Sequence, residues 1–110
     1  GKYLNLAGKT DIMELMEIFS RAKLVMAPDS GSAHLAWATG NPSIITIFTC
    51  TPKEVLAPFG SPDKYIALGG SGLPCQPCFK RKCKLKKHVN ACTCFPNPKD
   101  VIDVINTLIF

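Results

Sequence analysis

The chain has 110 residues, of which 46% are hydrophobic and 19% are charged, and its formal net charge is +5 at pH 7. This composition excludes an intrinsically disordered protein and is typical of one globular domain with a modest core. No apolar run reaches the ~20 residues that span a bilayer, and no signal peptide is visible. Because the sequence has no initiator methionine and starts inside a strand-like run, we expect it to be a fragment of a longer protein.

Apolar runs and helical patterns alternate along the chain. In order, they predict a strand at 2–8, a helix at 10–23, a strand at 23–27, a helix at 30–39, strands at 42–48 and 63–68, and a helix at 97–110. Continuous apolar strands that alternate with helices are typical of a parallel sheet whose faces are covered by helices. The sequence therefore predicts an α/β fold, a Rossmann-like parallel sheet flanked by helices.

Short-range signals mark the ends of the predicted helices. Asp11 and Glu14 have the spacing of a capping box at the start of the first helix. Gly40 follows the second helix, where a glycine commonly closes the last turn. The final helix is expected to begin with Asn97 as its cap and Pro98 in its first position.

The turn after the strand at 23–27 reads Asp29-Ser30-Gly31, with His34 one turn further on. Ligands of parallel α/β sheets bind beyond the carboxyl ends of the strands. We expect Ser30 to cap the helix and Gly31 to leave its backbone approachable. The first N–H groups of the helix, at the positive end of its dipole, then form an anion site to which His34 adds a hydrogen bond. The sequence therefore predicts that this turn binds a diphosphate.

Two other interpretations of this turn compete. Ser30, His34 and Asp29 are the residue types of a hydrolase triad, but triads are assembled from distant segments, and the G-x-S-x-G elbow is missing. The turn can also be an ordinary capped helix with a partly buried histidine and no ligand.

Residues 69–97 form a loop-rich segment between the last strand and the last helix. Six basic residues gather in it, and no Asp or Glu occurs between Tyr65 and Lys99: the six are Lys80, Arg81, Lys82, Lys84, Lys86 and Lys87. Such a patch indicates an anionic partner, which can be phosphate, nucleic acid or a lipid headgroup. The alternative is a solvated loop that lysines keep soluble.

The same segment holds a cysteine cluster. Five cysteines follow the spacing C-x2-C-x4-C-x8-C-x-C, with His88 between them, and Cys50 lies apart: the five are Cys75, Cys78, Cys83, Cys92 and Cys94. A C-x2-C pair followed by further cysteines is typical of a metal site, because one tight turn offers two thiolates to a tetrahedral ion. A structural zinc ion, two disulfides and free thiols remain three open interpretations.

The stretch from Asn5 to Pro42 resembles the C-terminal half of glycosyltransferase family 9, the ADP-heptose:lipopolysaccharide heptosyltransferases. It shares the opening "N-L-x-G-K-T" and the later pattern "D-S/T-G-x-x-H-L-A-x-A-x-G-x-P". The family's cysteine spacing also occurs in "PCQPCFKRKC", which extends the resemblance through residues 74–92. The chain departs from the family at 49–53, where "TCTPK" replaces a "G-P-T-D-P" turn.

The resemblance implies a GT-B enzyme, in which two Rossmann-like domains enclose the active cleft. Residues 1–110 would be part of the C-terminal domain that binds the nucleotide sugar, with a Cys-rich basic loop at 69–97 and a helix at 98–110. Lys9 and Thr10 would lie against the nucleobase, and the sugar diphosphate would be lined by Asp29, Ser30, Gly31 and His34. The donor would resemble ADP-heptose.

The resemblance also implies what this chain lacks. The acceptor, lipopolysaccharide core or lipid A, and the catalytic base would belong to a missing N-terminal domain, so no catalytic residue is assigned here. The full-length protein would be a glycosyltransferase that needs no cofactor for catalysis, whereas the fragment would bind donor weakly and transfer no sugar. It would work in the cytoplasm of a Gram-negative bacterium, with a possible peripheral contact at the inner membrane.

Relative to the family pattern Cys94 is an extra cysteine, which leaves Cys75, Cys78, Cys83 and Cys92 as the expected ligands of a structural zinc ion. A rival function uses the same loop: a basic zinc-binding module that binds nucleic acid. That rival leaves the α/β portion of the sequence without a role, so nucleic acid is not the expected partner.

Overall fold

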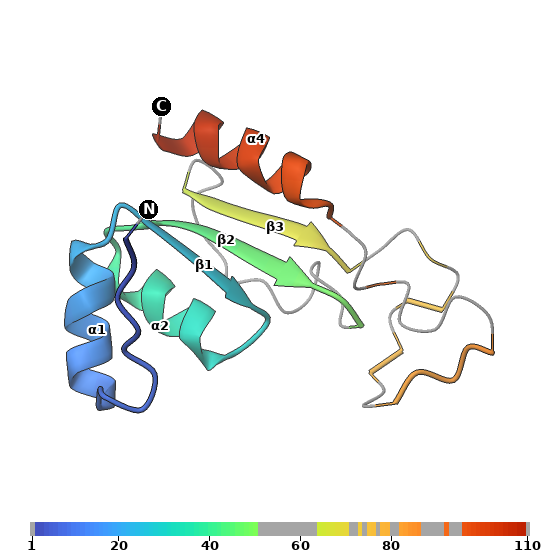
Figure 1. Cartoon of the computed structure of the whole chain (residues 1–110), viewed down its shortest axis with the longest axis horizontal. Coiled ribbons are helices and arrows are strands. Elements are labelled where there is room, and N and C mark those ends of the chain that lie inside the picture. The colour runs from blue at the N-terminus through green and yellow to red at the C-terminus, as the bar shows by residue number, and fades with distance from the viewer. Residues whose placement is uncertain are drawn as a thin grey trace.

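The computed structural model describes residues 2–50, 64–70, 73, 75, 76, 78, 79, 82–86, 92 and 96–109. Its elements follow the order α1 (Ile12–Arg21), β1 (Leu24–Pro28), α2 (Gly31–Thr39), β2 (Ser43–Phe48), β3 (Tyr65–Gly69) and α4 (Pro98–Ile109), as Figure 1 shows. The three predicted helices and the strands predicted at 23–27, 42–48 and 63–68 are confirmed close to their expected bounds.

The predicted strand at 2–8 is wrong. Residues 2–6 have no regular secondary structure, and the N–H of Lys9 donates to the carbonyl of Leu6 at 2.9 Å to close a turn through Gly8, whose φ is 71°. Tyr3 and Leu4 are 92% and 77% exposed. A strand forms only where its backbone pairs with a neighbour, and the sheet described here contains β1, β2 and β3 alone.

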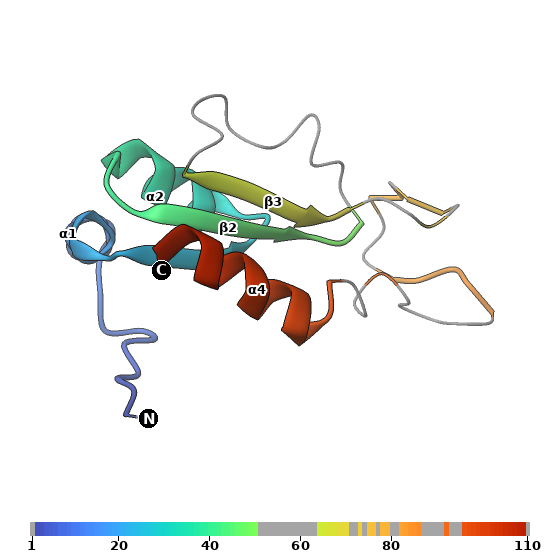
Figure 2. The same cartoon turned by 90° about the horizontal axis from the view of Figure 1, so that it is seen from above.

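The sheet is parallel throughout, in the order β1-β2-β3. Val25 of β1 lies opposite Ile44 of β2, which lies opposite Tyr65 of β3. The central strand β2 is the core: the side chains of Ile44, Ile45 and Phe48 are fully buried. Figure 2 shows why, since α2 covers one face of the sheet and α4 lies along the other. All three strands therefore end at the same edge, where ligands of such sheets bind.

The helix α2 packs through its small residues. Ala33 and Ala36 are 2% and 0% exposed, and Ala36 joins Val25 and Ile44 in the core cluster. At its end Gly40 has a φ of 74°, and its N–H donates to the carbonyl of Trp37 at 3.1 Å, so the predicted glycine cap is confirmed.

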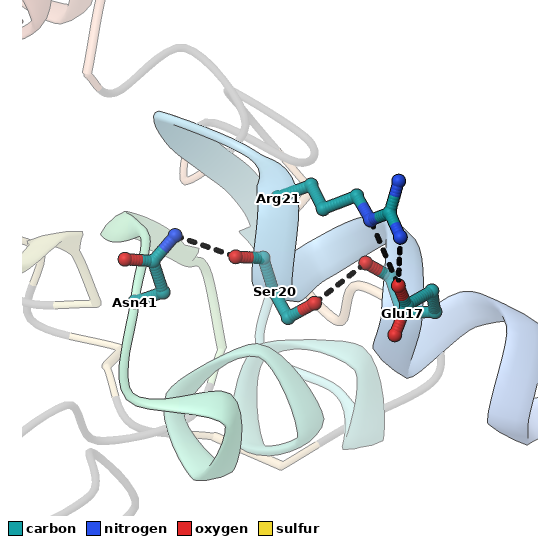
Figure 3. Close-up of polar contacts among 4 residues, drawn as sticks. All are labelled: Glu17, Ser20, Arg21 and Asn41. Atoms are coloured by element: carbon teal, nitrogen blue, oxygen red, sulfur yellow. Dashed lines mark hydrogen bonds and ion pairs between the residues drawn. The ribbon is translucent and has the colours of Figure 1, made fainter.

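The helix α1 has no fully buried residue, but its half-buried Phe19 packs against the core cluster. Figure 3 shows the end of this helix, where Arg21 pairs with Glu17 at 2.6 Å and the side-chain amide of Asn41 donates to the carbonyl of Ser20. The last bond ties α1 to the connection before β2. Both side chains of the ion pair are largely exposed, so the pair adds little to the free energy of folding.

The helix α4 begins as its sequence predicts. The side-chain oxygen of Asn97 accepts from the N–H of Asp100 at 3.0 Å, and Pro98 is the first helical residue. Val101 is 9% exposed and Ile102 is 54% exposed, as expected for a helix with one apolar face. None of the described helices is both long and apolar enough to span a bilayer.

Candidate functional site

The predicted donor turn lies where β1 ends. The strand stops at Pro28, and the N–H of Asp29 donates to the carbonyl of Ile47 at 3.2 Å, which fixes the turn against the central strand. Asp29 and Ser30 are half-buried, and α2 starts at the next residue. The structure therefore places these two residues and Gly31 at the carboxyl edge of the sheet, as expected.

The prediction that Ser30 caps α2 is only half right. Ser30 occupies the N-cap position with extended backbone angles (φ −159°, ψ 172°), but its side chain makes no capping hydrogen bond. The N–H of Ala33, a natural target of such a cap, instead donates to the backbone carbonyl of Ser30 at 3.2 Å. Ser30 thus occupies the cap position of α2 without capping the helix through its side chain.

The space beside Gly31 is open. Gly31 is exposed, and a Cβ atom built on it would meet nothing within 4 Å. His34, one turn further along, is also exposed. Uncapped N–H groups at the positive end of a helix, with open space before them, are suited to bind an anion.

Lys9 and Thr10 belong to a different turn, the one that precedes α1. Lys9 is exposed and Thr10 is half-buried. The helices α1 and α2 pack together, and in Figure 1 both begin on the lower side of the view. The structure thus puts the two predicted parts of the donor site at the beginnings of two neighbouring helices.

Two buried hydroxyl groups near Asp29 were not predicted as part of the site. Thr46 is 1% exposed, and the hydroxyls of Thr46 and Tyr65 are buried without a hydrogen-bond partner of good geometry in the described part of the chain. Burial raises the pKa of Tyr65, the neighbouring Thr46 hydroxyl opposes this rise, and the negative charge of Asp29 adds to it. We treat the two hydroxyls as neighbours, since no bond between them meets hydrogen-bond geometry. The sequence does contain a signal for a buried hydroxyl, since a threonine interrupts the apolar run "IITIF".

A cavity of about 240 Å³ lies elsewhere, lined by Trp37, Gly40, Pro42 and Lys64. Its lining comes from the end of α2 and from the residues that precede β2 and β3. Because the strands are parallel, this is the opposite edge of the sheet from Asp29. The cavity is therefore separate from the predicted donor turn.

Cys50, which is distant from the other cysteines in the sequence, lies beside two residues of the cysteine-rich loop in the fold. The four predicted zinc ligands are half-buried, and so is Cys50: the four are Cys75, Cys78, Cys83 and Cys92. The carbonyl of Cys50 accepts hydrogen bonds from the N–H groups of Cys78 (3.0 Å) and Phe79 (3.1 Å). Cys50 is therefore far from the C-x2-C turn in the sequence but next to it in the fold.

No three His, Cys, Asp or Glu side chains among the described residues are arranged to hold a metal ion together. The zinc site stays a prediction. Cys94 and His88 lie outside the described residues, as do Lys80, Arg81 and Lys87 of the basic patch. Its other members are exposed, namely Lys82, Lys84 and Lys86.

Comparisons with known proteins agree with the sequence motifs. The chain is 34% identical over 64 residues to the lipopolysaccharide core heptosyltransferase OpsX of Haemophilus influenzae. That match covers 58% of this chain and 18% of the relative's length. No solved structure matched the chain. The model of glycosyltransferase family 9 (heptosyltransferase) matches residues 1–89, and the chain therefore belongs to this family.

Proposed function

We propose that this chain is the donor-binding part of a glycosyltransferase that moves a heptose-like sugar from a nucleotide diphosphate sugar to lipopolysaccharide core. Membership of glycosyltransferase family 9 and the similarity to a lipopolysaccharide core heptosyltransferase support the reaction class. The observation that carries the donor role is the beginning of α2, which lies at the carboxyl edge of the sheet, receives no cap bond from the Ser30 side chain and has open space at the Cβ position of Gly31.

Each residue of the turn has a role in this proposal. The N–H groups at the start of α2 bind the diphosphate oxygens, and Gly31 lets those oxygens approach the backbone. The exposed His34 donates a hydrogen bond to a phosphate oxygen or a sugar hydroxyl. Asp29, held by its N–H on β2, accepts from sugar hydroxyls. Lys9 and Thr10 lie against the nucleobase.

The same arrangement would favour the chemical step. When the sugar leaves its phosphate, the bond between the anomeric carbon and the phosphate oxygen breaks, and negative charge grows on the departing diphosphate. A helix beginning that is fixed in place stabilises this charge without rearranging. The step needs no cofactor in this chain. We assign the catalytic base and the acceptor site to other parts of a longer protein, so the chain alone binds donor and transfers no sugar.

We also propose that the protein works in the cytoplasm and that the exposed Lys82, Lys84 and Lys86 contact anionic lipid at the inner membrane face. Co-sedimentation with phosphatidylglycerol vesicles, compared with phosphatidylcholine vesicles, tests this contact. Equal recovery of the chain with both kinds of vesicle contradicts it.

Calorimetric titration of the chain with ADP, GDP and UDP tests the donor role. We expect saturable binding with a preference for ADP, and no transfer of sugar when an ADP-sugar and lipopolysaccharide core are supplied. Absence of binding for all three nucleotides overturns the donor role, and measurable transfer overturns the assignment of the base to another part. Tight, salt-sensitive binding of arbitrary DNA would instead favour the nucleic-acid-binding alternative.

A further inference from the structure

The strand β1 forms one edge of the sheet, and its only partner among the described strands is β2. The carbonyl of Lys23 and the N–H of Asp29 form hydrogen bonds with β2, of 3.0 and 3.2 Å. The backbone groups of successive residues in a strand point to alternate sides, so the odd-numbered residues of β1 face β2. The N–H and C=O groups of Leu24 and Met26 therefore face the open edge of the sheet.

The sequence of β1 is that of an interior strand and not of an edge. Leu24 to Ala27 is a continuous apolar run, which is typical of strands enclosed within a parallel sheet. Natural edge strands usually carry charged residues or bulges, and β1 has neither along its continuous register with β2. Met26 is 55% exposed, whereas no residue of β3, the strand at the other edge, is exposed. An apolar strand is therefore left uncovered on one side.

The helix α1 continues past the same edge. It packs against α2, and Figure 1 shows it beside α2 at the outer limit of the molecule. Only Ala22 and Lys23 separate it from β1, so it lies on the outer side of this strand. Phe19 packs against the core cluster, and Ile12 lies about two turns earlier on the same side of the helix. Ile12 is nevertheless 64% exposed, because the described sheet does not extend beneath it.

We propose that the open edge of β1 and the apolar side of α1 bind a parallel β-strand from a part of the longer protein outside this chain. The added strand pairs with the backbones of Leu24 and Met26, and its apolar side chains pack beneath Ile12. In such strand addition, main-chain bonds give affinity and alternate side chains give specificity. The match to the heptosyltransferase of Haemophilus influenzae covers 18% of that protein, which leaves ample chain to supply the strand.

The first residues of this chain do not cover the edge themselves. Tyr3 and Leu4 are 92% and 77% exposed, and Figure 2 shows the segment before α1 projecting from the body of the molecule. The inference shares with the proposed function only the existence of a longer protein. It concerns the edge of β1 and not the beginning of α2, so it can fail while ADP binding holds, and the reverse.

The test measures amide hydrogen exchange in this chain and in the longer protein that contains it. We expect the amides of Leu24 and Met26 to exchange at least about 100-fold more slowly in the longer protein. Val25 and Ala27, whose N–H groups face β2, are matched controls that should be protected in both. Equally fast exchange of Leu24 and Met26 in both proteins overturns the proposal. If the chain alone exchanges throughout, the longer protein decides: Leu24 as slow as Val25 supports the added strand, and fast exchange of Leu24 contradicts it.

Exchange in the chain alone at several concentrations tests the choice of occupant. We expect Leu24 and Met26 to exchange rapidly at every concentration. Protection that grows with concentration would show that a second copy occupies the edge. Protection that is independent of concentration would show that the chain covers the edge with its own residues. Either result contradicts a strand from outside this chain.

A substitution at Met26 gives an independent measurement. The side chain of Met26 lies on the face opposite α2, where an interior strand would be covered and an edge strand is not. Met26→Lys should leave the Tm of the chain alone within about 2 °C and lower that of the longer protein by at least about 4 °C. Met26→Leu, the matched control, should change both by less than about 2 °C. Equal shifts for Met26→Lys in the two proteins contradict the proposal.

Discussion

The beginnings of α1 and α2 are built in opposite ways. At α1, the side chain of Asp11 accepts from the N–H of Glu14 at 2.7 Å, and the Glu14 carboxylate accepts from the N–H of Asp11 at 3.2 Å, so the predicted capping box is confirmed. At α2, Ser30 has the cap position and a suitable side chain but makes no cap bond. One helix beginning is closed by its own side chains and the other is left open.

Packing explains why this chain tolerates the open end. α1 has no fully buried residue and packs on the core through the half-buried Phe19, so local bonds such as the capping box carry a larger share of its stability than in α2. α2 buries Ala33 and Ala36 against the sheet, and this packing holds the helix without a cap. The helix that the core secures is the one whose beginning is available for an anion.

The largest expected effect comes from placing a negative charge at the open end. Gly31→Asp adds a carboxylate in front of the N–H groups that bind diphosphate in our proposal. Repulsion should weaken ADP binding by about tenfold or more, which corresponds to about 1.4 kcal/mol. Calorimetry on the variant and the wild-type chain measures this.

Gly31→Ala is the matched control for this substitution. Its Cβ meets nothing within 4 Å, so the free energy of unfolding should stay close to the wild-type value. Because alanine adds bulk beside the diphosphate but no charge, ADP affinity should fall less than in Gly31→Asp. Because an acidic residue in the first turn favours a helix, Gly31→Asp should not lower the free energy of unfolding. Unchanged ADP binding by Gly31→Asp contradicts the open-end account.

The next effect concerns the closed end. Asp11→Ala removes the side chain that accepts from the Glu14 N–H, so the free energy of unfolding should fall by about 1 kcal/mol. Urea denaturation followed by circular dichroism gives the value. Ser30→Ala, the same kind of change at α2, should cost less than about 0.5 kcal/mol, because no bond is lost. Equal losses of unfolding free energy in Asp11→Ala and Ser30→Ala would contradict the proposed difference between the beginnings of α1 and α2.

A substitution in the packing beneath α2 should change the free energy of unfolding by a smaller amount, and should raise it. Thr46→Val replaces a buried hydroxyl that has no hydrogen-bond partner in the described residues by a methyl group of similar size. The free energy of unfolding should rise by up to about 1 kcal/mol, since the cost of burying the hydroxyl is removed. Denaturation in urea measures the change. A clear loss of stability would show that Thr46 and Tyr65 are hydrogen-bonded.

The smallest expected effect on stability appears only at alkaline pH. Burial raises the pKa of folded Tyr65 above its ordinary value of 10.0, so the neutral phenol is favoured in the folded chain. Its contribution to stability is complete below the pKa of the unfolded chain and is lost as the pH rises through the higher folded pKa. Tyr65→Phe should therefore show a shallower loss of stability above about pH 10. Identical alkaline profiles would contradict this.

Features that depend on near neighbours were predictable from the sequence. The capping box of α1, the glycine that closes α2 and the Asn97 cap each require only a few consecutive residues. The buried strands were also visible as apolar runs. The strand expected at 2–8 failed because pairing needs a second strand, which a local pattern does not reveal.

In the candidate site, too, local features were predictable from the sequence and contacts between distant segments were not. Its position followed from the turn sequence, but whether Ala33 bonds to the hydroxyl or the carbonyl of Ser30 depends on the turn's backbone angles. The association of Cys50 with Cys78 rests on hydrogen bonds between distant segments, which cysteine spacing in the sequence does not reveal. The strand register that places Tyr65 opposite Ile44 likewise joins segments that are distant in the sequence.

The most direct test of the open helix beginning is amide NMR during titration with ADP. The account predicts that the resonances of Gly31, Ser32 and Ala33 shift and saturate, whereas those of the capped first turn of α1, Ile12 to Glu14, stay nearly unchanged. Saturable shifts in α1 with none in α2, or no shifts in either helix, would contradict the claim that the open beginning of α2 binds the diphosphate.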